Sequence, residues 1–286
     1  MLFSILIANY NNGNYFKDCY ASIAEQTYQK FEVIIIDDGS TDDSIHLIET
    51  LIKNDPRFRL YKNEKNSGCG YTKRKCAELA AGDICGFLDP DDALDPIALE
   101  VMVKAHQEHP QASLVHSTLW YCDDDLKKIK RYEGAKPVVA SPGFTNIDIP
   151  VIHFTSYKNE HYRRTQGINP NQHRAVDIDL YLKLSEVGEF VFLDQPLYKY
   201  RIHKNGISTS NRTKAFYGHL KAIAAAEDRR GVNLENEVEP VLVGQGKSHL
   251  FYEARFCNPK YLVYRLWLLF KQNPAGFLKS FFVKQK

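Results

Sequence analysis

The sequence lacks the features that would assign a function class on composition alone. Its six cysteines include no C-x-x-C pair, so the usual zinc spacing and a disulfide framework are excluded and reduced thiols are expected. Neither charge sign is in excess, because 37 lysines and arginines face 35 aspartates and glutamates for a formal net charge of +2. A nearly neutral chain has no general attraction for nucleic acid, so we expect no nucleic-acid partner.

Long hydrophobic runs are also absent. No stretch reaches the roughly 18 apolar residues that a membrane-spanning helix needs. Residues 1–8 are apolar but have no basic residue ahead of them, and a turn-forming cluster follows directly at Asn9–Asn14. We therefore expect no export signal and a cytoplasmic protein.

The first hundred residues alternate strand and helix patterns. Short apolar or β-branched runs at 3–8, 31–36, 57–61 and 84–88 alternate with helical periodicity at 15–26, 44–52 and 72–81. Strands that alternate with helices of about ten residues indicate βαβ units. The pattern predicts an α/β fold with a mostly parallel sheet flanked by helices.

The second half of the chain is less regular. A helix is predicted at 97–109, a strand at 113–121 with a hairpin tip at Asp123–Asp125, an irregular segment at 134–173, a helix at 176–187 and a strand at 190–193. After residue 210 only helical patterns occur, at 214–230, 238–256 and 261–271. We therefore expect a catalytic domain over 1–210 and a C-terminal helical region over 211–286.

Three polar clusters follow three of the predicted strands: Asn9–Asn12, Asp37–Asp42 and Asp89–Asp92. In parallel sheets ligands bind beyond the carboxyl ends of the strands. The three carboxylates of Asp89–Asp92 repel one another unless a cation or hydrogen-bond donors offset them. Mg²⁺ and Mn²⁺ use such carboxylates and complete their shell with water and phosphate oxygens; a solvated turn is the alternative.

The other polar groups each allow two interpretations. Asp38 can accept a hydrogen bond from a nucleobase or a ribose, and Gly39 would permit close approach of the backbone to that ligand. Alternatively, this cluster only ends the strand, and Ser40 or Thr41 caps the next helix. The cations Lys73, Arg74 and Lys75 can meet a diphosphate or lie on solvated surface.

Two later residues are equally open. Asp177 can act as a general base or as a partner of a helix dipole. His203 can be a ligand or a structural histidine.

Taken in order, these motifs resemble family 2 glycosyltransferases of the GT-A fold. The resemblance covers about residues 1–208 and rests on the segments Ser4–Asn11, Val33–Asp42, Gly86–Asp92, Asp177–Leu180 and Leu197–His203. It implies an inverting enzyme, of the hexosyl- or N-acetylhexosaminyl-transferring type, that moves a sugar from a nucleotide-diphosphate donor to an acceptor hydroxyl. A UDP-sugar is the favoured donor, and cell-surface polysaccharide or glycolipid synthesis is the expected setting.

The resemblance also implies roles for individual residues. The nucleotide would contact Ala8, Asn9, Tyr10, Asp38, Arg74, Asp89 and Asp91, a Mn²⁺ or Mg²⁺ ion would be held by Asp92, Asp91 and His203, and Asp177 would be the catalytic base. The family usually has Glu before the base, where this chain has Val176, and often Asn after the arginine, where it has Lys75. Two rival functions are a sugar-1-phosphate nucleotidyltransferase and a non-catalytic nucleotide-sugar-binding subunit.

The end of the chain is basic and aromatic. Residues 254–286 hold seven lysines or arginines and no acid, interleaved with aromatic and leucine side chains. Such a segment suits peripheral contact with an anionic membrane surface at the inner face of the membrane, where a lipid-linked acceptor would lie. Packing on the catalytic domain or on a second subunit, as in a homodimer, is the alternative.

Overall fold

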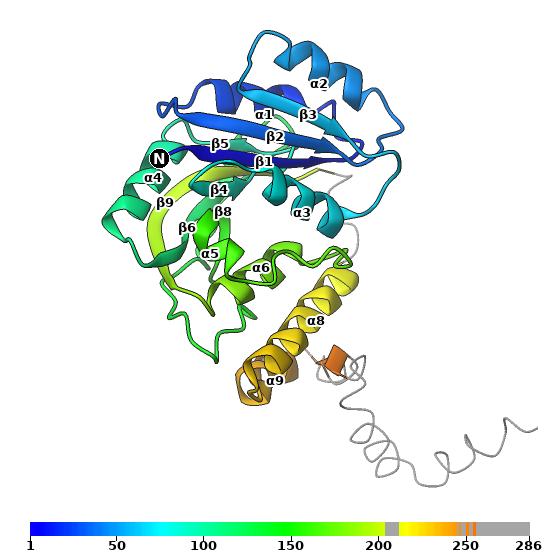
Figure 1. Ribbon diagram of the computed structural model, residues 1–286. Coiled ribbons are helices and arrows are strands. Elements are labelled where there is room, and N and C mark those ends of the chain that lie inside the picture. The colour runs from blue at the N-terminus through cyan, green and yellow to red at the C-terminus, as the bar shows by residue number, and fades with distance from the viewer. Residues whose placement is uncertain (204–211, 245, 247–249, 252–253, 256–286) are drawn as a thin grey trace, which may run out of the picture.

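The computed structural model describes residues 1–203, 212–244, 246, 250, 251, 254 and 255. These residues form a nine-stranded sheet with the strand order β3-β2-β1-β4-β8-β6-β9-β5, and β7 pairs with β6 (Figure 1). The strands are β1 (Phe3–Asn9), β2 (Phe31–Asp37), β3 (Phe58–Lys62), β4 (Ile84–Phe87), β5 (Ala93–Leu94), β6 (Ala112–Cys122), β7 (Lys128–Arg131), β8 (Ile152–Lys158) and β9 (Glu189–Arg201).

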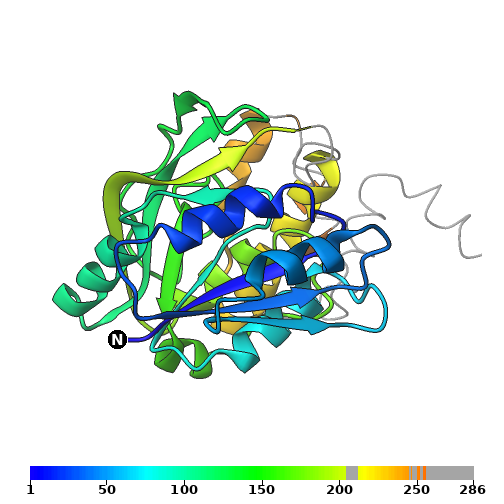
Figure 2. The same cartoon turned by 90° about the horizontal axis from the view of Figure 1, so that it is seen from above.

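Helices cover both faces of this sheet. They are α1 (Phe16–Ala24), α2 (Ser44–Ile52), α3 (Cys69–Leu79), α4 (Ala98–Glu108), α5 (Asn159–Arg163), α6 (Val176–Leu184), α8 (Arg212–Arg230) and α9 (Glu235–Gly244). Figure 2 shows α1 and α2 in front of the sheet. The predicted α/β architecture with flanking helices is confirmed.

Alternation along the central strands builds two cores. Ile5 and Ile7 of β1 pack in one core with side chains of α1, α2 and α4. Leu6, which points the other way, belongs to a second core with α3, α6, α8 and α9. Successive side chains of a strand face opposite sides, so an unbroken apolar run such as β1 requires helices on both faces.

Strand direction places the site. β1, β2, β3 and β4 are mutually parallel. β8 is antiparallel to both β4 and β6, and β9 is parallel to β6, so six strands run in one direction. The carboxyl ends of β1, β2, β4, β6 and β9 therefore meet at one edge, here called the carboxyl edge. The antiparallel strand β8 begins at this edge.

Three expectations for the second half need correction. The irregular segment 134–173 contains β8 and α5, and the predicted strand at 190–193 is part of the 13-residue β9. Of the predicted helix at 238–256, α9 covers the part up to Gly244 and has Pro240 inside it, and the later described residues 250, 251, 254 and 255 are also helical. Leu220 of α8 and Val238 of α9 share a core with Leu6 of the sheet, so these helices do not form a separate core.

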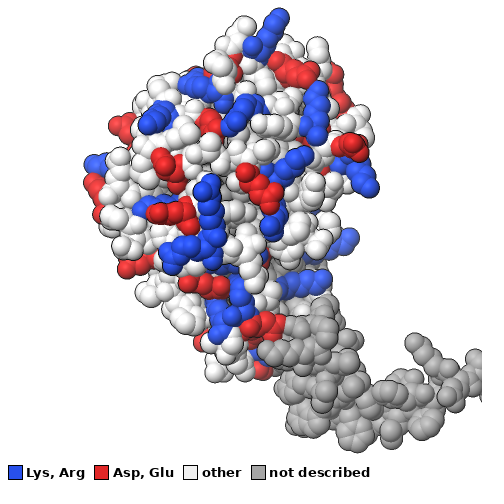
Figure 3. Space-filling view, viewed as in Figure 1, with Lys and Arg blue, Asp and Glu red and all other residues white. Residues whose placement is uncertain are grey.

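The predicted helix at 261–271 and the basic tail from residue 256 onward lie outside the described residues. In the described part, no helix combines the length and the hydropathy of a membrane span. On the face viewed in Figure 3, basic and acidic side chains are interspersed, as the net charge of +2 implies.

Candidate functional site at the carboxyl edge

The ends of β1 and β2 are tied together by side chains. Asn9 donates from Nδ2 to Asp37 Oδ2 at 2.8 Å, and Ser40 donates to Asp37 from its backbone N–H at 2.8 Å and its hydroxyl at 2.6 Å. Ser40 therefore braces β2, and the expected capping of α2 is wrong, since no side chain caps that helix from its N-cap residue, Asp43. Beyond Asn9, Tyr10 is 41% exposed, which leaves an aromatic face open to a ligand.

The neighbouring Asp38 is buried and holds the loop before α3. Its carboxylate accepts from Asn63 Nδ2 at 2.8 Å and from the backbone N–H groups of Ser67 and Gly68, both at 2.9 Å. Gly39 has φ +73°, and a Cβ there would lie 2.7 Å from the backbone of Lys65. The glycine is thus required for its backbone conformation and for close approach of this loop.

The Asp89–Asp92 loop leaves β4 at the centre of the carboxyl edge. Asp92 is fully enclosed: Oδ2 accepts from the Tyr198 hydroxyl at 2.7 Å and Oδ1 from the backbone N–H of Arg201 at 2.8 Å. Burial and the charge of Asp91 raise the pKa of Asp92 well above its usual range. Both oxygens of Asp92 thus serve to join the loop to β9.

Asp91 faces the histidine that follows β9. His203 Nε2 lies 2.8 Å from Asp91 Oδ2, and its ring centroid is 4.5 Å from that of Tyr15. Burial and the neighbouring charge of Asp89 raise the pKa of Asp91. His203 Nδ1 is buried without a hydrogen-bond partner among the described residues.

Arg201 holds this part of the edge together. Its guanidinium donates to the backbone oxygen of Asp91 at 2.7 Å and to Asp18 of α1 at 2.7 Å, and also to the backbone oxygen of Asp124 at the β6–β7 hairpin tip. The guanidinium also lies 5.0 Å from the ring centre of Tyr15. One buried side chain therefore connects four segments that are distant in the sequence.

A lysine on α3 neutralises the first carboxylate of the loop. Lys73 Nζ lies 3.1 Å from Asp89 Oδ1, with its side chain largely buried. Burial raises the pKa of Asp89, but the charge and hydrogen bond of Lys73 and the neighbouring His153 together outweigh burial, so the pKa is lowered. Burial alone would lower the pKa of Lys73, because it disfavours the charged amine. The negative charge of Asp89 is the main opposing influence, and the pKa of Lys73 is raised overall.

Arg74 points away from this cluster. It donates to the backbone oxygen of Ile168 at 3.0 Å and pairs with Glu78 on its own helix at 2.8 Å. The expectation of Arg74 at the nucleotide stays a prediction, while Lys73 is the cation that the structure places at Asp89. The reason is the periodicity of α3: Lys73 lies on the buried face of the helix with Cys76 and Ala77, whereas Arg74, one position further, does not.

The two aspartates at the start of α6 have different environments. Asp179 is buried against Lys183 at 2.6 Å. Asp177, with a side chain 36% exposed, accepts no hydrogen bond from the described residues and lies 3.8 Å from His153 Nε2 through Oδ2. Lys73 and His153 each interact electrostatically with both Asp89 and Asp177, so Asp177 lies close to the carboxylate loop.

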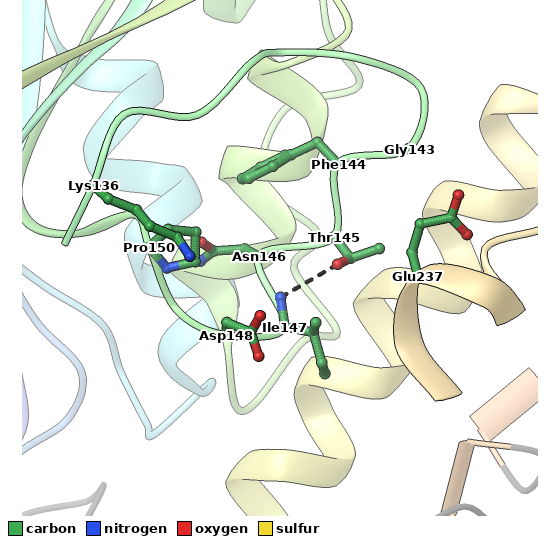
Figure 4. A pocket seen from close by; sticks show the side chains of 9 residues that line it. All are labelled: Lys136, Gly143, Phe144, Thr145, Asn146, Ile147, Asp148, Pro150 and Glu237. Carbon is green, nitrogen blue, oxygen red and sulfur yellow. Dashed lines mark hydrogen bonds between the residues drawn. The ribbon is translucent and has the colours of Figure 1, made fainter. Parts of the chain in front are cut away.

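A separate shallow pocket of about 200 Å³ lies between the 136–150 loop and α9 (Figure 4). Its wall includes Lys136, Asp148 and Glu237, and the Thr145 hydroxyl accepts from the Ile147 N–H at 3.4 Å. None of its lining residues belongs to the predicted site. The pocket and the carboxyl edge are distinct features.

Comparison with known proteins identifies the family. Residues 4–172 match the model of glycosyl transferase family 2. The chain belongs to glycosyltransferase family 2. It is 31% identical to a chondroitin synthase of Escherichia coli, over 81% of this chain and 33% of that protein. It is 30% identical to a hyaluronan synthase of Pasteurella multocida, over 87% of this chain and 25% of that protein. It thus spans a third or less of the length of these relatives.

Solved structures show the same fold. S. aureus TarS 1-349 in complex with UDP superposes with a TM-score of 0.65 at 18% identity, covering 91% of this chain and 73% of that one. A mannosyltransferase of Pyrobaculum calidifontis in complex with GDP-Man and Mn²⁺ superposes with a TM-score of 0.64 at 16% identity, and the match covers 95% of this chain and 81% of that one. The GT-A fold expected from the motifs is confirmed.

The donor groups at Asp91 and His203 fit a divalent cation. Mn²⁺ and Mg²⁺ prefer carboxylate oxygens and fill their remaining positions with water and diphosphate oxygens, and of the two ions Mn²⁺ more readily adds an imidazole nitrogen. Within the described ranges, no group of three or more His, Cys, Asp or Glu side chains surrounds a metal position, so a cation here depends on such outside oxygens. Asp92, with both oxygens engaged, suits the metal less well than was expected.

Several residues of this site were not singled out from the sequence. Tyr15, Arg201 and Tyr198 position the loop, and His153 lies beside Asp177. Lys73 is already among the candidate diphosphate cations of the sequence, and its position on the buried face of a helix is the signal that distinguishes it from Arg74. His153 had none, because it sits in the segment that showed no periodicity.

We expect Tyr198→Phe to lower the free energy of unfolding by about 1–3 kcal/mol, the cost of leaving a buried acceptor unpaired. The lost hydroxyl donates to Asp92 and accepts the Asp89 N–H at 3.3 Å. Denaturant unfolding measures the change. The control is Tyr71→Phe, because that ring is 43% exposed on α3; equal stability of the two variants would show that Asp92 does not depend on Tyr198.

Proposed function

We propose that this protein is an inverting glycosyltransferase that moves a sugar from a UDP-sugar to an acceptor hydroxyl in polysaccharide or glycolipid synthesis. The main observation in support is that the Asp89–Asp92 loop and Asp177 lie close together at the carboxyl edge, where Lys73 and His153 each interact with both Asp89 and Asp177. Relatives named chondroitin and hyaluronan synthases support a polysaccharide product. TarS structures with UDP and UDP-GlcNAc support the nucleotide.

The base is Asp177. Its partly exposed carboxylate, which accepts no hydrogen bond from the described residues, takes the proton of the acceptor hydroxyl as that oxygen bonds to the anomeric carbon, and the bond from this carbon to the diphosphate breaks on the opposite face. Asp179 cannot take this part, because it is buried against Lys183. Attack opposite the leaving group inverts the anomeric configuration.

The nucleotide lies along the ends of β1, β2 and β4. Ala8 and Asn9 end β1, and the exposed ring of Tyr10, which follows the strand, offers a stacking surface to a base. Asp38 and Asp89 line the same edge, where Lys73 supplies a positive charge.

The leaving group is handled at the end of the Asp89–Asp92 loop. A divalent cation bound by Asp91 and His203, with Asp92 supporting the loop, would neutralise charge on the departing diphosphate. Contact of the C-terminal segment with a membrane or a second subunit stays a prediction.

A thermal-shift screen of nucleotide sugars with and without Mn²⁺ tests the proposal. We expect UDP-sugars to raise Tm in a Mn²⁺-dependent way, by an amount that grows with the ratio of ligand concentration to Kd. ADP-, GDP- and dTDP-sugars serve as controls. Stabilisation by free nucleoside triphosphates and sugar-1-phosphates, but by no nucleotide sugar, would favour a nucleotidyltransferase instead.

A further inference from the structure

His153 occupies an unusual place beside the base. Because β8 is antiparallel to β4 and β6, its first residues lie at the carboxyl edge of those strands. The His153 ring stacks on Tyr198, with centroids 5.2 Å apart and planes 22° apart. Its Nε2 faces Asp177 Oδ2 at 3.8 Å, and only 12% of its side chain is exposed.

The surroundings determine where its proton resides. Burial lowers the pKa of His153, against the opposing pull of Asp89 and Asp177, so the ring is neutral near pH 7. Nδ1 is buried without a hydrogen-bond partner among the described residues. A proton on Nδ1 would bury a donor that has no acceptor, so the favoured tautomer carries it on Nε2, the atom that faces Asp177.

Asp177 needs such a donor. No hydrogen bond from the described residues fixes its carboxylate, which projects from the first turn of α6. A base with one oxygen held by an N–H keeps the other oxygen directed at its substrate. The 3.8 Å separation exceeds a hydrogen bond, and catalytic contacts of this kind often tighten only in the substrate complex.

We propose that His153 is a positioning residue for Asp177: its Nε2–H holds one carboxylate oxygen so that the other receives the proton of the acceptor hydroxyl. This inference rests on the proposed function, since it takes Asp177 as the base. Stacking on Tyr198 fixes the plane of the imidazole. His153 thereby links the orientation of the base to the residue that holds Asp92.

Two substitutions separate the stacking from the hydrogen bond. His153→Phe keeps an aromatic ring against Tyr198 but has no donor, whereas His153→Gln places a carboxamide N–H near the position of Nε2. The assay is UDP release by the full chain from the UDP-sugar that stabilises it, with chondroitin or hyaluronan oligosaccharides as acceptors. We expect His153→Phe to lower kcat about 10- to 100-fold, as loss of a supporting hydrogen bond typically does, with donor KM changed less than about threefold.

His153→Gln should recover kcat to within about fivefold of the original chain, and His153→Phe should add no further loss to Asp177→Asn. Unchanged kcat in His153→Phe, or an additive loss in the double variant, would overturn the inference. If His153→Phe does not fold, the comparison of His153→Gln with His153→Asn replaces it, because the shorter Asn side chain does not reach the position of Nε2. Equal kcat values of these two variants would reject the positioning role of His153. Full activity of Asp177→Asn would instead reject the proposed base.

Discussion

Asp177→Asn is expected to lower the rate of sugar transfer by about 10²- to 10⁴-fold, the usual contribution of a general base. The amide keeps the size of the side chain but cannot take a proton. Because Asp177 is partly exposed and accepts no hydrogen bond from the described residues, the substitution should leave the fold intact. UDP release with acceptor measures the rate, and calorimetry measures nucleotide affinity, which should be unchanged.

A matched control uses another aspartate at the start of a helix. Asp43 is exposed at the start of α2 and makes no side-chain capping bond, so Asp43→Asn makes the same change of charge away from the proposed chemistry. Its transfer rate should equal that of the original chain. If Asp177→Asn and Asp43→Asn are equally active, the base is another residue and the inverting mechanism proposed here loses its proton acceptor.

The second large effect is expected at Asp91. Asp91→Asn should lower transfer at least about 100-fold and remove the Mn²⁺ dependence of UDP binding, because a bound cation supplies several kcal/mol of charge stabilisation. Calorimetric titration of UDP with and without Mn²⁺ measures this. Asp95→Asn, which retains an oxygen able to accept the Ile97 N–H, is the control.

The affinity for Mn²⁺ should also depend on pH. Burial and Asp89 raise the pKa of Asp91, so a proton competes with the metal over a wider acidic range than at an ordinary aspartate. Affinity should therefore fall as the pH is lowered. Mn²⁺-enhanced UDP binding that survives in Asp91→Asn would contradict the assignment of this carboxylate to the metal.

Much of the first half of the fold could be predicted because its signals are local. The unbroken apolar runs of β1 and β2 require cover on both faces, and α2 occupies the predicted residues 44–52. Polar residues directly after buried strands could be assigned to one edge, since parallel strands end together. That reasoning placed Asp38, Asp89 and Asp91 without any knowledge of their contacts.

Tertiary structure decided which of these side chains are available to a ligand. Asp91 and Asp92 are neighbours of the same type, yet only Asp92 is enclosed, because Tyr198 and Arg201 reach it from β9. No local pattern reports hydrogen bonds between residues about a hundred positions apart. Which of Lys73 and Arg74 pairs with Asp89 depended in the same way on how α3 is rotated against the sheet.

The residues by themselves thus determined the α/β class, the edge that carries the site and the aspartates at its centre, because hydrophobic periodicity and strand-end polarity act over a few residues. Only the tertiary structure brought His153 to Asp177 and His203 to Asp91. Both contacts depend on strand pairing: β8 begins at the carboxyl edge because it runs antiparallel, and β9 ends there because it pairs in parallel with β6. Such pairings are settled by packing over the whole sheet.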